Sequence, residues 1–183
     1  TMLTDIGVDT GDMLLKETVK IGENDSMGEL TEQLSQMAGD LLVRTLEGVV
    51  TGQVTPEPQD HEQSTHAPKL TKADAQIDWD LPAATLHNKI RGQQPWPGAV
   101  STLSGKQVKI VKTRRYSEAS NLPPGSMIDK TEDGILVQTA DATLEILVVQ
   151  PEGKPKMAAL DWSNGALQGD VASYAFETSQ PLP

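Results

Sequence analysis

The sequence has 183 residues, a formal net charge of -11 at pH 7 and no cysteine. The missing thiols exclude disulfide frameworks, thiolate zinc sites and cysteine nucleophiles, and they fit a cytoplasmic protein. The acidic balance disfavours a general nucleic-acid binder, and no apolar run approaches the roughly 18 residues that a membrane span needs.

The first stretch of the chain is predicted to form short strands joined by a turn. Residues 1–4 and 18–21 have strand-like patterns, and the run Val8-Asp9-Thr10-Gly11-Asp12 between them has turn chemistry. Aspartate is common in turns because its carboxylate accepts hydrogen bonds from nearby backbone N–H groups. By pattern alone, Asp9 is therefore an ordinary turn residue.

An amphipathic helix is predicted over residues 26–47. Ser26 is a suitable N-cap, and Glu29, three residues later, completes a capping box. Apolar residues recur along one face at three- and four-residue spacing: Met27, Leu30, Leu34, Met37, Ala38, Leu41, Leu42 and Leu46. Two short strands are a poor cover for such a face. Residues 1–52 are therefore predicted to be the C-terminal end of a larger α/β domain, with this face exposed or covered by another part of the protein.

Residues 53–70 are polar and contain little apolar material, so they are predicted to be a linker. His61 and His66 lie in this segment without a cysteine or a second pair of histidines, and we expect them to be solvated rather than to bind metal. His87, further along the chain, is expected to be structural or exposed. The sequence predicts no metal site.

Two tryptophans organise the stretch that follows the linker. Ile77-Asp78-Trp79 is strand-like, residues 81–92 have helical periodicity, and Pro95-Trp96-Pro97-Gly98 predicts a rigid corner that ends the helix. Asp80 is the expected N-cap of the helix, and Pro82 is tolerated in its first turn. Because tryptophan carries a large apolar surface, this stretch is expected to anchor a core.

From residue 99 onward the pattern is typical of β structure. Short strands at roughly ten-residue spacing are predicted at residues 99–103, 108–112, 122–128, 134–139 and 143–149. Such spacing favours a small barrel, with residues 157–162 as a short helix or a closing strand. The second domain is expected to span residues 71–178, followed by a disordered tail at 179–183.

The basic residues are concentrated in the middle of the chain. Residues 63–115 hold nine Lys or Arg against three acids, whereas the segments on either side are acidic. A stripe without an intervening acid comprises Lys106, Lys109, Lys112, Arg114 and Arg115. Two interpretations of this stripe stay open, a solvated strand face or a surface that contacts phosphates.

Several short motifs resemble the methionyl-tRNA formyltransferase family. Gly7-Val8-Asp9-Thr10-Gly11-Asp12-Met13 is similar to a signature late in the family's catalytic domain. Further motifs resemble the family's C-terminal domain and follow in the family's order: Pro68-Lys69-Leu70, Ile77-Asp78-Trp79, Ile90-Arg91, Pro95-Trp96-Pro97-Gly98-Ala99, Leu122-Pro123-Pro124-Gly125, Gly134-Ile135, and Gly153-Lys154 through Met157. Each motif alone is weak, but the ordered set is specific.

The resemblance implies an α+β chain, in which the remnant of a Rossmann-like α/β formyltransferase domain precedes a small OB-like β-barrel. It implies transfer of a formyl group from the co-substrate 10-formyltetrahydrofolate to the amino group of methionyl initiator tRNA, without a metal. The family's active site uses an Asn, a His and an Asp, and the motif matches that Asp to Asp9. Gly7 and Val8 fall where the wall of the family's folate pocket runs.

The chemistry explains why such residues are needed. Attack of the amine on the formyl carbon creates an oxyanion, which an Asn N–H and a protonated imidazole can stabilise. A carboxylate beside the His holds its ring and favours its charged form, and Asp9 would supply that carboxylate. The resemblance also makes the basic stripe, together with Lys154 and Lys156, the candidate surface for tRNA, because Lys and Arg suit the positioning of RNA phosphates.

None of the three histidines stands in the context of the family's catalytic His. The catalytic Asn and His are expected to lie before residue 1, so the chain is expected to be inactive alone and to work with a catalytic domain. A related nucleotide-sugar formyltransferase or formyltetrahydrofolate hydrolase is an alternative, although a basic barrel favours the tRNA enzyme. A third interpretation is a non-catalytic RNA-binding or protein-binding barrel, in which Asp9 is only a turn residue.

Overall fold

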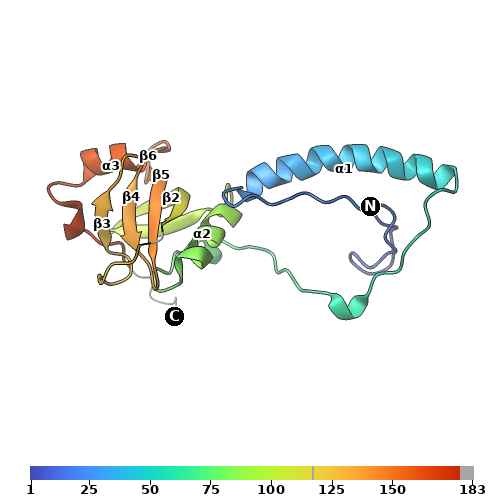
Figure 1. Cartoon of the computed structure of the whole chain (residues 1–183), viewed down its shortest axis with the longest axis horizontal. Coiled ribbons are helices and arrows are strands. Elements are labelled where there is room, and N and C mark those ends of the chain that lie inside the picture. Colours follow the sequence, from blue (N-terminus) through green and yellow to red (C-terminus); the bar gives the residue numbers. More distant parts are fainter. Residues whose placement is uncertain (117, 178–183) are drawn as a thin grey trace. The chain divides into compact units, whose positions relative to one another are not determined.

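The computed structural model describes residues 1–116 and 118–177 (Figure 1). It divides into two compact units, Thr1–Lys69 and Leu70–Pro183. The predicted tail at residues 179–183 lies outside the described residues.

The first unit is built around helix α1 (Met27–Val50). The predicted capping box is present, because Ser26 Oγ accepts a hydrogen bond from Glu29 N–H while the Glu29 carboxylate accepts one from Ser26 N–H. The helix continues past Gly48, where the prediction ended it, and Thr51 forms its C-cap. Gly48 therefore does not end the helix, which continues to Val50.

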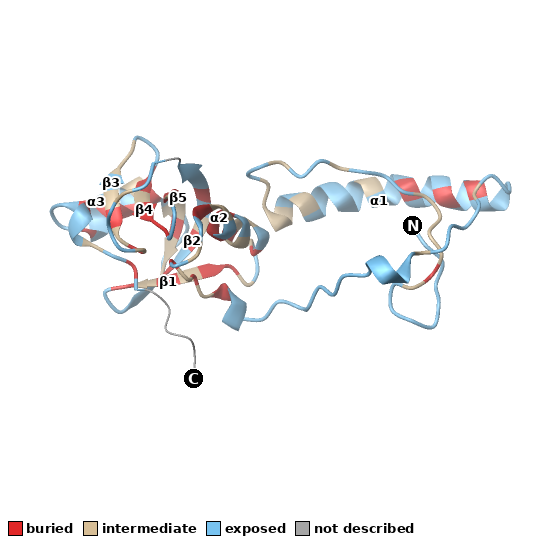
Figure 2. Ribbon diagram, turned by 60° about the horizontal axis from the view of Figure 1, so that its bottom comes forward, coloured by how far each residue is buried: buried red, intermediate tan, exposed pale blue. Residues whose placement is uncertain are grey.

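The predicted apolar face of α1 is poorly covered, since Leu41 is the one buried residue among its eight members. Its buried residues are Leu41, Thr45 and Gly48, which lie in its C-terminal half (Figure 2). Leu42 and Leu46, which belong to the predicted face, are each at least half exposed. Within the first unit, this helix therefore lacks the cover that its pattern requires.

The strands expected at residues 1–4 and 18–21 do not form a sheet. Met2 and Met13 form an isolated antiparallel bridge, and Met13 forms a second one with Glu57. Residues 18–21 are extended but lie outside any ladder of the described chain, since no neighbouring strand supplies hydrogen-bond partners there. A Rossmann-like sheet is therefore not confirmed by this unit.

The second unit contains a six-stranded antiparallel sheet. Its strands are β1 (Ala99–Leu103), β2 (Lys106–Tyr116), β3 (Met127–Lys130), β4 (Ile135–Gln138), β5 (Thr143–Pro151) and β6 (Met157–Ala158). The order is β1-β2-β5-β4-β3, and β6 pairs with β5. The strand predicted at 122–128 is shorter than expected, because Pro123 and Pro124 have no N–H to donate to a ladder.

The ladders leave β1 and β3 as edges, so the sheet is not closed into the predicted barrel. One segment, residues 175–177, touches both edges through isolated bridges. Glu177 N–H donates to Thr102 O on the β1 side at 2.9 Å, and Phe176 N–H donates to Gly125 O just before β3 at 2.9 Å. These contacts are isolated bridges and not a strand that closes the sheet.

Two α-helices flank the sheet in the described part of this unit. Helix α2 (Ala83–Gly92) packs against β2, and α3 (Ala159–Ala166) follows β6 directly, so residues 157–162 form the end of a strand and the start of a helix. Short 3-10 turns are η1 (His61–Gln63) in the first unit and η2 (Ala73–Ala75) and η3 (Val171–Ser173) in the second. Figure 2 shows the buried residues gathered on the strands and on α2.

The core of the second unit contains a stack of three aromatic rings. Phe176 lies 5.2 Å from Trp79 and 6.4 Å from Trp162, measured between ring centroids, and the rings are nearly parallel. The Trp79 indole N–H is satisfied by Ser101 Oγ at 2.9 Å. The expectation that this stretch anchors a core is confirmed for Trp79, which is fully buried, and is wrong for Trp96, which is 50% exposed.

The segment before Trp79 is held against α2 by polar side chains. Gln93 Nε2 donates to Asp74 O at 2.8 Å, and Lys89 Nζ donates to Gln76 O at 2.5 Å. The Thr71 hydroxyl and backbone N–H bind the Asp74 carboxylate, and these hydrogen bonds lower the pKa of Asp74 below its usual value. The start of the second unit is thus attached to its first helix.

Candidate functional site

Asp9 lies in a tight loop between two chain segments that run antiparallel. Leu3 N–H donates to Asp12 O at 2.9 Å and Leu14 N–H donates to Thr1 O at 2.9 Å, so residues 4–11 form the loop. Asp9 has a φ of 57°, in the left-handed region that non-glycine residues rarely adopt. Its carboxylate accepts no hydrogen bond from the described residues, so it is available to a partner from elsewhere.

The residues beside Asp9 are close-packed on one side and open on the other. A Cβ on Gly11 would lie 1.9 Å from Leu3 O, so only glycine fits at that position. Val8 is 91% exposed, and Gly7 is exposed as well. The two residues expected at a folate pocket therefore present an open surface, with no wall opposite them in the first unit.

The segment predicted to be a linker lies against the Asp9 loop. Met13 and Glu57 exchange both backbone hydrogen bonds at 2.8 Å. Gln59 Nε2 donates to Asp9 O at 2.9 Å and to Gly11 O at 2.7 Å. Sequence reasoning missed Gln59, because a lone glutamine in a polar segment carries no signal of a contact 50 residues away.

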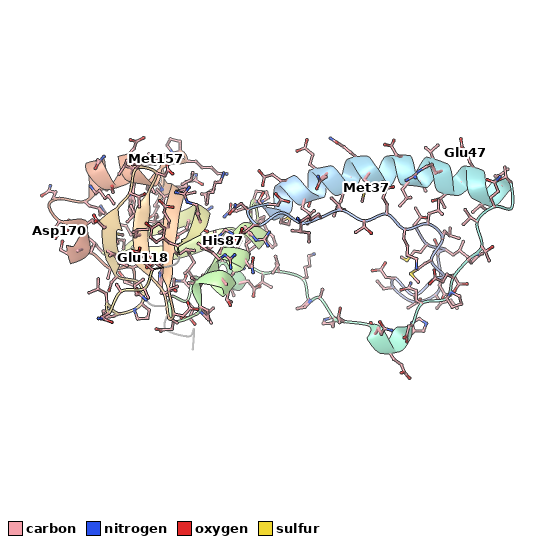
Figure 3. All side chains as sticks on the ribbon, in the orientation of Figure 1. Met37, Glu47, His87, Glu118, Met157 and Asp170 are labelled. Carbon is pink, nitrogen blue, oxygen red and sulfur yellow. The ribbon has the colours of Figure 1, made fainter. Side chains whose placement is uncertain are left out.

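The three histidines are not brought to Asp9 within the unit that holds it. His61 and His66 are exposed. His87 belongs to the second unit, where it is buried on α2 (Figure 3) and its Nδ1 lies 3.0 Å from Thr113 Oγ1. His87 is thus a structural residue, which is one of the two roles expected for it.

The strand β2 and the turn after β5 bring several of the predicted tRNA-binding residues to one end of the sheet. Lys106 and Lys154 line a groove of about 570 Å³ between the β1–β2 turn, the β5–β6 turn and α3, together with Met157. Lys109 lies opposite Gln150 in the β2–β5 register, and Gln150 Nε2 donates to Lys154 O at 3.1 Å. Lys106, Lys109 and Lys154 are exposed.

Arg114 is engaged by two carboxylates. Its Nε donates to Glu145 Oε2 at 2.6 Å and its Nη2 to Asp133 Oδ2 at 2.9 Å. The hydrogen bonds and charges of Glu145 and Asp133 raise the pKa of the Arg114 guanidinium above its usual value. Glu145 is fully buried and also accepts from Thr131 Oγ1 at 2.5 Å. The charge of Arg114 is therefore compensated within its own sheet.

The remaining predicted basic residues are Lys112, Arg115 and Lys156, all of them exposed. Lys112 lies at an irregularity of the β2–β5 register, and Arg115 lies opposite Leu144 further along the same strand. Lys156 follows the β5–β6 turn that carries Lys154. The seven predicted residues thus fall into a group near the groove and a group toward the end of β2.

Among residues 1–116 and 118–177, no group of three or more His, Asp or Glu side chains is arranged to hold a metal ion. No helix in the described part of the chain is long and apolar enough to cross a membrane.

The second unit is an antiparallel sheet flanked by short helices. Residues 69–167 match the family described as "Formyl transferase, C-terminal domain". The chain belongs to this family, and the family predicted from the motifs is confirmed.

Curated relatives match both units of the chain. Over 165 residues, the chain is 44% identical to the methionyl-tRNA formyltransferase of Solibacter usitatus and 41% identical to that of Clostridium perfringens (strain 13 / Type A). The matches cover 90% of this chain and 52% and 53% of those proteins. The chain spans about half the length of the curated relatives it matches.

Solved structures share the fold at low identity. HypX from Aquifex aeolicus, in complex with tetrahydrofolic acid, has a TM-score of 0.67 at 18% identity over 92% of this chain and 30% of its own. An N-formyltransferase from Helicobacter canadensis, in complex with folinic acid and dTDP-3-aminofucose, has a TM-score of 0.62 at 17% identity over 82% of this chain and 54% of its own. These likenesses support the fold alone.

Proposed function

We propose that this chain acts as the C-terminal portion of a methionyl-tRNA formyltransferase, which transfers a formyl group from 10-formyltetrahydrofolate to the amino group of methionyl initiator tRNA. The identity of 44% over 165 residues carries the proposal, because a match of that length runs through both units. The reaction belongs to translation initiation, which places the enzyme in the cytoplasm.

The same proposal covers the domain organisation. Residues 1–52 would be the end of a Rossmann-like formyltransferase domain, 53–70 a connection, and 71–178 an OB-like barrel domain. The exposed apolar side chains of Leu42 and Leu46 support the first assignment, because an apolar helix face of this kind normally lies under a sheet. The bridges from residues 175–177 to both sheet edges support the barrel.

In the proposed reaction, the amine attacks the formyl carbon and the developing oxyanion must be stabilised. The Asp9 carboxylate would orient a histidine and favour its protonated form. That histidine is not one of the three in this chain, so we expect no turnover by the chain alone. Gly7 and Val8 would lie at the wall of the pocket for the folate co-substrate, and their exposure leaves them accessible to it.

The proposed tRNA-binding surface comprises Lys106, Lys109, Lys112, Arg115, Lys154 and Lys156. Such residues would contact phosphates and position the tRNA rather than read its bases. We leave Arg114 out of this surface because Glu145 and Asp133 already bind it. Since the chain as a whole is acidic, we expect weak binding that depends on salt.

The test is a titration of initiator tRNA into this chain at two salt concentrations, beside an assay for formylation. The variant Lys106→Gln with Lys154→Gln should weaken binding and make its salt dependence shallower, by a slope of about 0.7 to 0.9 for each phosphate that is no longer neutralised. The control variant, Lys20→Gln with Lys72→Gln, removes the same charge from two other exposed lysines and should bind like the unaltered chain.

If the test variant and the control variant weaken binding equally, the proposed surface is contradicted. Binding would then depend on the total charge of the chain and not on these lysines. Turnover by the chain alone would mean that one of its own histidines takes part in catalysis. Formylation of a nucleotide-linked amino sugar, without formylation of methionyl-tRNA, by the intact enzyme would favour the alternative transferase.

A further inference from the structure

Asp9 depends on a contact from a distant segment for its backbone conformation. A φ of 57° is unfavourable for a non-glycine residue, so neighbouring groups must hold it in place. The amide nitrogen of Gln59 donates to the carbonyl oxygens of Asp9 and Gly11, at 2.9 and 2.7 Å. One side chain therefore donates hydrogen bonds to the backbone carbonyls on both sides of Thr10.

The other supports of the loop leave the orientation of Asp9 open. Gly11 packs against Leu3 O, which anchors the end of the loop next to the paired segments. Thr10 Oγ1 donates to Asp5 Oδ2 at 3.2 Å, which is a contact within the loop. Among the described residues, only Gln59 ties the Asp9 backbone to the rest of the first unit, through a segment that the Met13–Glu57 bridge holds in register.

We propose that Gln59 is a positioning residue, which fixes the direction of the Asp9 carboxylate by holding the turn at residues 9–11. The inference rests on the proposed function, because it takes Asp9 as the carboxylate that supports the reaction's histidine. Gln59 itself touches no reacting group. Its side chain supplies the two N–H donors that a pair of neighbouring carbonyl oxygens requires.

The experiment uses the intact formyltransferase that contains this sequence, with three variants at one position. Gln59→Met keeps the length of the side chain and removes the donors. Gln59→Glu places a carboxylate against two carbonyl oxygens, and Gln59→Lys restores a donor that can reach both. The control is Gln63→Met. Gln63 lies four positions further along the same segment, and its Nε2 donates to Asp60 Oδ2 at 2.6 Å, a contact within that segment.

We expect Gln59→Met to lower kcat by about tenfold to a hundredfold, because misplacing a catalytic group by about 1 Å has effects of this size. Gln59→Glu should lose at least as much, and Gln59→Lys should recover part of the rate. KM for the tRNA should stay the same. Gln63→Met should match the unaltered enzyme.

The pH dependence separates positioning from a loss of stability. A displaced Asp9 supports the protonated histidine less well, so the pKa of that histidine falls. The limb on which activity drops with rising pH should therefore move to lower pH in Gln59→Met. Limited proteolysis of the loop at residues 4–11 should also become faster in Gln59→Met and stay unchanged in Gln63→Met, and this readout does not depend on activity.

The variant Asp9→Asn separates the role of Asp9 from the role of Gln59. If it leaves formyl transfer intact, the proposed role of Asp9 is wrong, and the role of Gln59 falls with it. If Asp9→Asn abolishes transfer while Gln59→Met keeps the full rate, the pH profile and the proteolysis pattern of the unaltered enzyme, then Gln59 is not a positioning residue and the proposed function stands.

Discussion

Arg114 belongs by sequence to a basic stripe, and by structure to an ion-pair cluster with Glu145 and Asp133. Glu145 lies 31 positions later in the chain, directly opposite Arg114 in the β2–β5 register. Because the carboxylate of Glu145 is fully buried, it requires a charged donor, and Arg114 supplies it while also reaching Asp133. A residue that the sequence pattern offers as a phosphate contact is thus needed to pair with a buried carboxylate of its own sheet.

We predict that Arg114→Leu lowers the stability of the protein, because the buried Glu145 loses its charged partner. Urea unfolding followed by tryptophan fluorescence measures the change. Lys109→Leu, on the same strand, should stay within about 0.5 kcal/mol of the unaltered protein. The double variant Arg114→Leu with Glu145→Leu should recover part of the stability, and a double variant that is as unstable as the single one would contradict this explanation.

Helix α2 shows that a helix start can be set by a residue far from it in sequence. Asp80 was the expected N-cap, but Pro82 occupies that position and the prediction was wrong. Proline has no side-chain acceptor, so the first free N–H of the helix, that of Ala83, donates instead to Asp141 Oδ1 at 2.8 Å. Asp141 lies in the turn between β4 and β5, which fixes the helix against the sheet.

We predict that Asp141→Ala lowers the stability of the second unit by about 1 kcal/mol, as the removal of other helix caps does. For a unit of this size the melting temperature should fall by roughly 4 °C. Asp80→Ala removes the same kind of side chain from the position predicted by sequence, and it should have little effect on thermal unfolding. A larger destabilisation by Asp80→Ala than by Asp141→Ala would show that Asp80 caps the helix after all and would contradict this prediction.

The whole molecule consists of two units with different sources of stability. The core cluster around Trp79 and Phe176 is drawn entirely from residues 77–176, so the second unit has a core of its own. The first unit exposes apolar side chains along α1 and has few buried ones. Its stability should therefore depend on what covers that helix.

We predict that residues 70–183 fold alone, with one cooperative thermal transition, because their core needs no residue from the first unit. Tryptophan fluorescence reports this unit specifically, since residues 1–69 contain no Trp, Tyr or Phe. Residues 1–69 alone should show little cooperative unfolding by circular dichroism and should bind a hydrophobic dye. A broad, uncooperative transition of residues 70–183 would contradict the independence of that core.

By itself, the sequence determined what depends on neighbouring residues: the Ser26–Glu29 capping box, helix α2, most of the strands, and the ordered motifs that place the chain in its family. It also singled out Asp9 through a motif. The tertiary structure alone decided the partners of Arg114, the cap of α2 and the contact of Gln59 with the Asp9 loop. These depend on segments that meet across 31, 58 and 50 positions, and no local pattern records which distant residue will supply a donor or an acceptor.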